Sequence, residues 1–328
     1  MTITQKSFED TLKSIGDFAG EKKLAVALSG GGDSIALAHL MSGFCRKHDV
    51  EFHALTVDHG LRAESAKEAK TIGKWVKIWP DVIHKILKWT GDKPKTRIQE
   101  EARKVRYALI SSYCKKHKIK YLFLAHHGGD QIETFLFRLA KGSGLDGLSV
   151  MPPMQEMGDI VLVRPLLNYT HEDMIETCRK NKLNWVEDPS NEADKYARVR
   201  LRNSREVLEK EGLSTERILT LGKRLSRARL ALNQMADKAF ELCFMHKEKA
   251  HLELNLAKFL DQPDEIGIRI LQKAMEDVAG AKKYPPSLQI LEEITGRIYR
   301  DPSFRAATLG GCIIRRRKSR GLIEIRAE

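Results

Sequence analysis

The chain of 328 residues is 42% hydrophobic, which permits a substantial core and two domains and indicates a globular protein. It contains no run of 18 apolar residues, so the sequence excludes a membrane-spanning helix. A formal net charge of +13 favours a polyanionic partner over a small neutral ligand, although a generally basic surface is the alternative.

The cysteines and the start of the chain both bear on cellular location. The cysteines lie far apart and form no Cys-x-x-Cys pair, so we interpret them as reduced thiols. The first ten residues have neither a basic start nor an apolar core, which is unlike a signal peptide. We therefore expect a cytoplasmic protein.

The most informative stretch follows a short helix expected over residues 7–19. An apolar run at 24–28 fits a buried parallel strand, and apolar residues recur at helical spacing from Ile35. Between them stand three consecutive glycines, the hydroxyls of Ser29 and Ser34, and Asp33 at the helix start. Bare backbone amides at the positive end of a helix dipole form a seat for a phosphate group. The alternative is a structural glycine turn capped by Asp33.

The spacing of this loop lacks the Lys-Ser/Thr of a P-loop and the third glycine of a dinucleotide fingerprint. It resembles instead the Ser-Gly-Gly-x-Asp-Ser loop of the N-type ATP pyrophosphatases. That resemblance implies that ATP is bound by its outer phosphates, that Asp33 helps to hold Mg²⁺, and that AMP is transferred to an oxygen. The ATP-binding residues implied in this loop are Ser29, Gly30, Gly31, Gly32, Asp33 and Ser34.

A second strand, expected over residues 51–57, ends in the polar segment 58–62. Polar residues at the carboxyl ends of parallel strands line the ligand crevice, so Asp58 and His59 are candidate site residues. Alternatively, His59 simply caps a strand. The sequence Val-Asp-His-Gly-Leu-Arg resembles a signature of one branch of the pyrophosphatases, which implies that Asp58 and His59 lie beside the adenosine of ATP.

The chain continues with a charged helix over 63–78, a strand over 82–89 and a helix over 97–117. Arg103, Lys104 and Arg106 in that helix form either a solvated face or a rim that meets phosphates. A strand over 121–125 then leads into a polar cluster at 126–134, in which Asp130 and Glu133 fall on the first turn of a helix. Carboxylates there favour the helix dipole and can be simple caps. Two histidines, two glycines and two acids are more polarity than a cap requires.

A strand over 160–163 and a helix over 170–182 complete five strands that alternate with helices. This order predicts an α/β fold with a doubly wound parallel sheet. We expect the catalytic domain to span 1–212. A linker helix over 214–246 would then open a smaller, mainly helical domain at 213–328, with helices over 264–279 and 286–300. Short strands are expected over 305–309, 312–316 and 322–326.

Two basic stretches suggest contact with nucleic acid. The denser one follows an acidic turn at 187–188, and the other, Arg315 to Lys318, stands in the last expected hairpin. The candidate tRNA-binding residues of the denser stretch are Arg198, Arg200, Arg202 and Arg205.

Five ordered segments together resemble the tRNA(Ile)-lysidine synthetases: 29–34, 57–62, 126–134, 164–167, and 187–191 with the arginines beyond. The resemblance is close over residues 20–205. It implies a ligase that forms a C–N bond between free lysine and C2 of the wobble cytidine in a CAU-anticodon isoleucine tRNA, using ATP and Mg²⁺. Asp33 would serve the adenylation step, and Asp130 and Glu133 would position the lysine amine.

One departure from that family stands at Gly129, where two successive acids are usual and this chain has Gly129 followed by Asp130. The role of the missing acid is then lost or moved to Asp130. Three rival functions stay open: a tRNA thiolase of the same superfamily, a small-molecule AMP-forming ligase, and a non-catalytic protein that binds tRNA or nucleotide. The absence of cysteine pairs argues against many thiolases, and the arginine-rich stretch argues against a small-molecule ligase.

Overall fold

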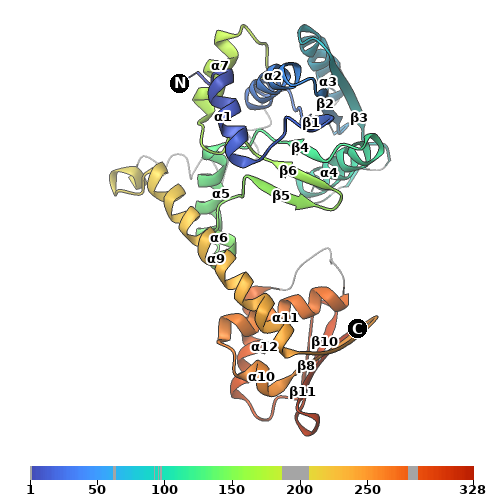
Figure 1. Cartoon of the computed structure of the whole chain (residues 1–328), viewed down its shortest axis with the longest axis vertical. Coiled ribbons are helices and arrows are strands. Elements are labelled where there is room, and N and C mark those ends of the chain that lie inside the picture. Colours follow the sequence, from blue (N-terminus) through green and yellow to red (C-terminus); the bar gives the residue numbers. More distant parts are fainter. Residues whose placement is uncertain are drawn as a thin grey trace. The chain divides into compact units, whose positions relative to one another are not determined.

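A computed structural model of the chain describes residues 2–61, 64–91, 93–94, 96, 98–186, 207–279 and 287–328. The chain divides into two compact units, Met1–Lys223 and Arg224–Glu328 (Figure 1). This division falls inside one long helix, and the functional boundary expected near residue 212 stays a prediction. Across the described ranges, no helix is both long and apolar enough to cross a membrane.

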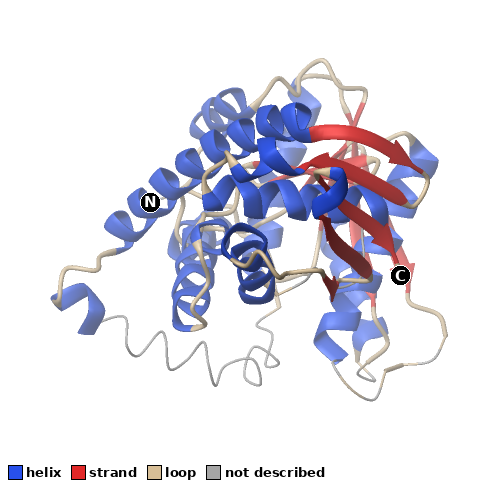
Figure 2. Ribbon diagram, turned by 90° about the horizontal axis from the view of Figure 1, so that it is seen from below, coloured by secondary structure: helices blue, strands red, loops and turns tan. Residues whose placement is uncertain are grey.

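The first unit alternates strands and helices for most of its length (Figure 2). Its elements are α1 (Gln5–Ile15), β1 (Lys23–Ala27), α2 (Gly32–Lys47), β2 (Glu51–Asp58), α3 (Ser65–Trp75), η1 (Val76–Ile78), β3 (Val82–Lys88), α4 (Ile98–His117), β4 (Tyr121–Phe123), α5 (Gly128–Ala140), α6 (Leu145–Leu148), β5 (Met154–Met157), β6 (Ile160–Val163) and α7 (His171–Lys180). The second unit begins within α9 (Thr215–Cys243).

The sheet of the first unit has the strand order β3-β2-β1-β4-β6-β5. All neighbours are parallel except β5 and β6, which form an antiparallel hairpin. The five predicted strands and their parallel pairing are therefore confirmed. The edge strand β5 was not predicted, because its four residues carry no alternating pattern of their own.

Helices cover both faces of this sheet, as a doubly wound fold requires. Leu24 and Val26 of β1 point into a core shared with α1, α2 and α7, whereas Ala25 points into a second core beneath α4. The alternation follows from the two-residue repeat of a strand. Because β1 is apolar on both faces, it lies at the centre of the sheet.

The strand order places β1 at a topological switch point. From β1 the chain moves outward through β2 and β3 and then returns to β4 on the opposite side of β1. Ligands of open parallel sheets bind in the crevice that opens at the carboxyl ends of such strands. The glycine loop follows β1 and the histidine cluster follows β4, so this topology brings both segments to one edge.

The second unit contains an antiparallel sheet with the order β7-β8-β11-β10-β9. Its elements are β7 (Phe244–Glu248), β8 (His251–Asn255), α10 (Leu256–Leu260), α11 (Asp264–Ala279), α12 (Leu288–Arg300), β9 (Ala306–Leu309), β10 (Cys312–Arg317), η3 (Lys318–Arg320) and β11 (Leu322–Ala327). The expected helices and the last three strands are present. The sheet is larger than predicted because α9 ends at Cys243, where the expected helix ran to 246, and β7 and β8 follow it.

Candidate active site

Side chains of neighbouring helices pack closely against two glycines of the loop that follows β1. Gly30 has a φ of +93°, and a Cβ there would lie 2.4 Å from Ile72 Cδ1. A Cβ on Gly32 would lie 2.4 Å from Ile175 Cδ1. The positive φ and the packing of Ile72 together favour glycine at position 30, whereas a Cβ at position 32 would closely meet only the terminal methyl of Ile175.

Ser34 fixes the shape of the loop through hydrogen bonds of its hydroxyl group. Its hydroxyl accepts the N–H of Gly30 at 3.1 Å and donates to the carbonyl of Gly31 at 2.9 Å, and the Ser29 hydroxyl lies 3.1 Å away. The carbonyl of Gly30 accepts the N–H of Val186 at 2.9 Å. Helix α2 begins directly after this turn, so its first N–H groups, which have no acceptor within the helix, face the edge of the sheet.

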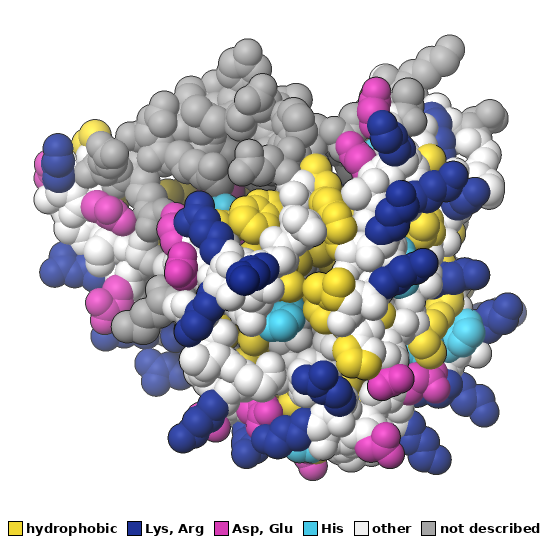
Figure 3. Space-filling view, turned by 90° about the horizontal axis from the view of Figure 1, so that it is seen from above, with side chains coloured by type: hydrophobic (Ala, Val, Ile, Leu, Met, Phe, Trp, Pro, Cys, Tyr) yellow, Lys and Arg dark blue, Asp and Glu magenta, His cyan; other side chains and the backbone are white. Residues whose placement is uncertain are grey.

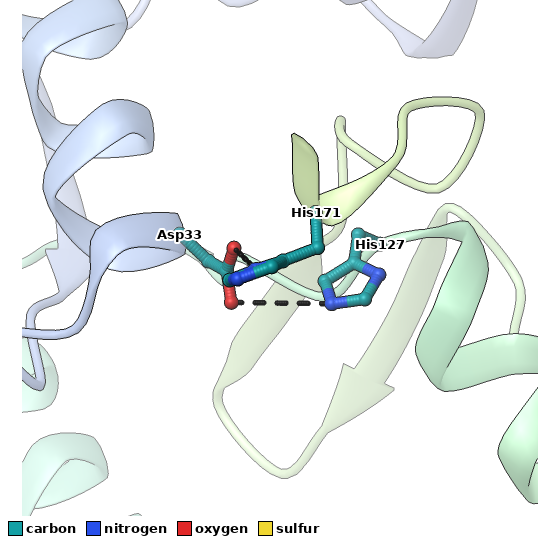
Figure 4. A group of neighbouring side chains, drawn as sticks. All are labelled: Asp33, His127 and His171. Atoms are coloured by element: carbon teal, nitrogen blue, oxygen red, sulfur yellow. Dashed lines mark hydrogen bonds and ion pairs between the residues drawn. The ribbon is translucent and has the colours of Figure 1, made fainter. Parts of the chain in front are cut away.

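Three side chains from three helix starts meet at this edge (Figure 4). Asp33 stands in the first turn of α2, His127 directly precedes α5, and His171 is the first residue of α7. His171 Nδ1 lies 2.7 Å from Asp33 Oδ1, and His127 Nε2 lies 3.9 Å from Asp33 Oδ2. Carboxylate and histidines therefore form one polar cluster at the switch point.

Hydrogen bonds assign the proton positions on His127. Its Nδ1 accepts the N–H of Gly129 at 2.9 Å, so in the neutral ring the proton sits on Nε2. That Nε2–H points toward two carboxylates, with Asp130 Oδ2 at 3.7 Å and Asp33 Oδ2 at 3.9 Å. A protonated nitrogen does not ligate a metal, so in this state His127 contributes a polar N–H near the carboxylates and no metal ligand.

The cluster of Asp33, His127 and His171 has the spacing of a metal site. Two histidines with one acid suit zinc better than magnesium, which prefers oxygen ligands. Since the proton on His127 Nε2 removes that ligand, the group best suited to hold a cation is the Asp33 carboxylate. Magnesium is commonly held by one or two carboxylates together with phosphate oxygens and water, and Asp33 fits that mode.

The structure explains why glycine occupies position 129. A Cβ at this position would lie 2.6 Å from Cε1 of His127 and 2.9 Å from its Nδ1. The absence of a side chain lets the imidazole fold over the start of α5, where it accepts the Gly129 N–H while Asp130 Oδ2 accepts the N–H of His127 at 2.9 Å. Asp130 therefore serves as a helix cap within the cluster.

His126 is half-buried, with its Nδ1 atom enclosed, and is held neutral. Burial lowers its pKa to about 4, the nearby carboxylate of Asp130 opposes that shift, and the positive charges of Arg164 and Arg103 add to it. Arg164 is itself buried, donating to the carbonyl of Pro152 at 3.0 Å and to Gln155 Oε1 at 2.8 Å. His127 thus belongs to the cluster with Asp33 and His171, whereas His126 stays neutral outside that group.

The remaining predicted residues lie on two elements. Asp58 ends β2, where its Oδ1 accepts the Ser65 hydroxyl at 2.6 Å and the N–H of Gly60 at 3.1 Å. His59 Nδ1 accepts the N–H of Leu61 at 3.1 Å. Both therefore shape the turn after β2. Glu133 lies half-buried on α5, one turn beyond Asp130.

The prediction of tRNA-binding residues falls outside the described residues, since Arg198, Arg200, Arg202 and Arg205 lie in 187–206. Across the face drawn in Figure 3, Lys and Arg side chains are dispersed among acidic ones and form no single patch. In α4, Lys104 binds Glu100 and Glu101 at 2.5 and 3.0 Å. Of the two interpretations of this basic helix, a solvated face or a rim that contacts phosphates, the solvated face therefore describes Lys104.

Sequence reasoning missed His171, which joins the cluster from a helix 138 positions beyond Asp33. One local signal was available. Thr170 and Asp173 form a capping box that marks the start of α7, and a helix that follows β6 must start near the carboxyl edge of the sheet. His127 stood in the predicted cluster, although no role was assigned to it.

Comparisons with known proteins agree on one family. Residues 2–210 match the PP-loop domain. The chain is 39% identical over 295 residues to a tRNA(Ile)-lysidine synthase of Wolbachia pipientis wMel, with 90% of this chain and 68% of the relative covered. It is 32% identical over 314 residues to a tRNA(Ile)-lysidine synthase of Ruegeria pomeroyi, covering 96% of this chain and 74% of that protein.

Among solved structures, a U34-tRNA thiolase from Methanococcus maripaludis superposes with a TM-score of 0.58 at 16% identity. The match covers 67% of this chain and 78% of the thiolase. At this identity the likeness shows a shared fold, which agrees with the doubly wound sheet.

Proposed function

Because the chain belongs to the tRNA(Ile)-lysidine synthase family, we propose that it joins free lysine to C2 of the wobble cytidine in the CAU anticodon of tRNA(Ile), using ATP. The observation that carries the proposal is the glycine loop at the switch point, which lies beside the carboxylates of Asp33 and Asp130. Phosphates and an amine would thus meet at one edge of the sheet.

The first step joins AMP to the cytidine. The O2 atom of the base attacks the α-phosphorus of ATP, and the bond to the bridging oxygen of pyrophosphate breaks. The N–H groups of the loop and of the start of α2 would hold the outer phosphates in line for this attack. Mg²⁺, when held by Asp33, would neutralise charge on the leaving pyrophosphate. Asp58 and His59 would lie beside the adenosine.

The second step transfers lysine. The neutral ε-amine attacks C2, the C–O bond to AMP breaks, and AMP leaves. Asp130 and Glu133 would orient the ammonium group and accept its proton, because charge-assisted hydrogen bonds fix an amine in the direction of attack. Arg198, Arg200, Arg202 and Arg205 would contact phosphates of the tRNA. The five cysteines are buried and form no disulfide, which suits a cytoplasmic enzyme.

Mass analysis of the anticodon-loop fragment tests the function. The protein is incubated with ATP, Mg²⁺, lysine and a tRNA(Ile) transcript, and the expected product gains the mass of lysine minus water on one cytidine. A transcript with uridine at the wobble position is the matched control and should stay unchanged. Replacement of oxygen by sulfur would identify a thiolase instead. Binding of ATP and tRNA without any mass change would indicate a non-catalytic homologue.

A further inference from the structure

The sheet of the second unit has one apolar face and one charged face. Its buried hydrophobic residues alternate along the strands and pack against α9, α11 and α12. The register places Glu253 of β8, Glu324 of β11 and Arg315 of β10 side by side on the opposite face. The charged face is thus made by three neighbouring strands.

Glu324 is the centre of this charged face. Its side chain is only 4% exposed, yet it belongs to the face turned away from the hydrophobic core. Its two oxygens contact different cations: Oε2 lies 3.0 Å from Arg317 Nη2 and 3.8 Å from Arg315 Nη1, and Oε1 lies 2.7 Å from Arg326 Nη2. One buried carboxylate therefore gathers three guanidinium groups, which we call the arginine array.

The alternation of β10 separates two kinds of arginine within one basic run. Arg315 and Arg317 belong to the array, whereas Arg316 points the other way and donates to the carbonyls of Ile298 and Asp301 at the end of α12. Arg316 is thus a structural residue. The run from Arg315 to Lys318 is a strand end followed by a turn, and only alternate members share one face.

The arginine array keeps a surplus of positive charge. Burial alone would raise the pKa of the Glu324 carboxyl, but the hydrogen bond from Arg317 and the charges of Arg317 and Arg326 outweigh burial and hold that pKa below its usual value. The carboxylate stays ionised and faces three cations. The side chains of Arg315, Arg317 and Arg326 remain 38%, 44% and 51% exposed, so each keeps donors for an outside acceptor.

We propose that Glu324 is a positioning residue that holds Arg315, Arg317 and Arg326 as a binding site for backbone phosphates of the tRNA. Planar guanidinium groups match phosphate oxygens in a bidentate way, and a buried anchor reduces the side-chain freedom that is lost on binding. Exposed Lys318 and Arg320 of the adjoining turn extend the positive surface. The inference rests on the proposed function for its ligand, a tRNA.

The proposed role of Glu324 predicts that Glu324→Gln lowers the affinity for tRNA, although the substitution makes the protein more positive. If the charge of this face alone set the affinity, Glu324→Gln would add a net positive charge and tighten binding to a polyanion. If Glu324 positions the arginines, the same substitution releases them and weakens binding. Direction alone thus distinguishes the two explanations.

The experiment measures the dissociation constant of a tRNA(Ile) transcript at several salt concentrations. Glu324→Gln should weaken binding about 3- to 10-fold and lower the salt slope by roughly one to two phosphate contacts. The matched control is Glu253→Gln, which removes the same charge from the same face; both carboxylates lie near His251, at 3.4 and 3.5 Å, but the three arginine contacts are to Glu324. It should leave binding unchanged or slightly tighter. Equal or tighter binding by Glu324→Gln would overturn the proposal.

A double-mutant cycle keeps the test independent of folding. Arg317→Gln alters a half-exposed side chain and should weaken binding in the wild-type background but much less in the Glu324→Gln background. Additive effects would show that Glu324 does not act through Arg317, and they would overturn the proposal even if Glu324→Gln is less stable. Because the readout is binding, failure of the array differs from failure of the proposed function, in which tRNA binds but no lysidine forms.

Discussion

The two charged regions of this protein position charge by different means. At the switch point of the first unit, backbone amides of the glycine loop and of the start of α2 are the proposed source of charge, and Ile72 and Ile175 would lie 2.4 Å from a Cβ on Gly30 and Gly32. On the charged face of the second unit, three long side chains provide the charge, and one buried carboxylate orders them. The first region depends on steric fit and the second on electrostatic pairing.

The difference predicts how each region responds to substitution. A site made of backbone is sensitive to an atom added at a closely packed position such as Gly30, because the amides move with the chain and the surrounding core is close-packed. A site made of exposed arginines tolerates changes of shape, because each side chain can find new rotamers in solvent. It responds instead to the loss of the charge that orders it.

The largest effect is expected from Asp33→Ala. Without this carboxylate the charge on the leaving pyrophosphate is not neutralised, so tRNA-dependent pyrophosphate release should fall about a thousandfold. His171→Asn is the control, because it removes the 2.7 Å partner of Asp33 and keeps the carboxylate; its loss should stay within about tenfold. Near-normal turnover of Asp33→Ala at saturating Mg²⁺ would remove Asp33 from the mechanism.

Gly30→Ala tests the steric character of the glycine loop. The alanine would have to keep the φ of +93°, and its Cβ would lie 2.4 Å from Ile72 Cδ1. We therefore expect about a hundredfold lower rate of pyrophosphate release. Gly91→Ala is a matched control with a φ of +97° and nothing within 4 Å of the added Cβ. It should lower stability by about 1 kcal/mol and leave the rate unchanged. Equal losses at Gly30 and Gly91 would show that backbone strain alone matters.

Gly129→Asp introduces the second acid that the family resemblance led us to expect here, and it should lower the rate about tenfold. The added Cβ displaces the His127 ring, which then no longer caps α5 or faces the two carboxylates. Gly129→Ala adds the same Cβ without charge and should have a similar effect on lysine transfer. A faster Gly129→Asp beside a slower Gly129→Ala would show instead that the missing acid had positioned the lysine amine.

Local signals in the sequence were sufficient for most of the fold. The buried run of β1, the glycine turn and the helical spacing of α2 each depend on neighbouring residues, so they were predicted in the right order. The strands β5, β7 and β8 were missed. Each has only four or five residues; β5 and β7 carry no alternating burial pattern, whereas β8 alternates at Leu252 and Leu254 but is too short for that signal to stand out.

The candidate site was predictable only in part. The sequence singled out Asp33 and Asp130 because both stand at helix starts after buried strands, and the structure places both near His127. The contact between Asp33 and His171 depends on how α7 packs against α2, which no local pattern reveals. For Gly129 the sequence left open whether the role of the missing acid is lost or moved to Asp130, and the structure adds that the His127 ring occupies the space of a Cβ at this position.

The smallest expected effect concerns pH and separates the two regions once more. The pKa of His126 is about 4 in the folded protein, mainly because of burial, against an ordinary value near 6.5. Since the unfolded chain binds the proton more readily, stability is lost as pH falls below that ordinary value. Between pH 7 and 5.5 the free energy of unfolding should fall by about 1 kcal/mol. Denaturant titrations of wild type and His126→Gln should differ by that amount in their pH dependence.

The arginines of the array stay charged over this range and the pKa of Glu324 lies below its usual value, so the acidic shift should leave the Glu324-dependent part of tRNA binding intact. A pH-dependent loss of that part would show that the charged face also depends on a titrating neighbour, with His251, 3.5 Å from Glu324, as the first residue to replace.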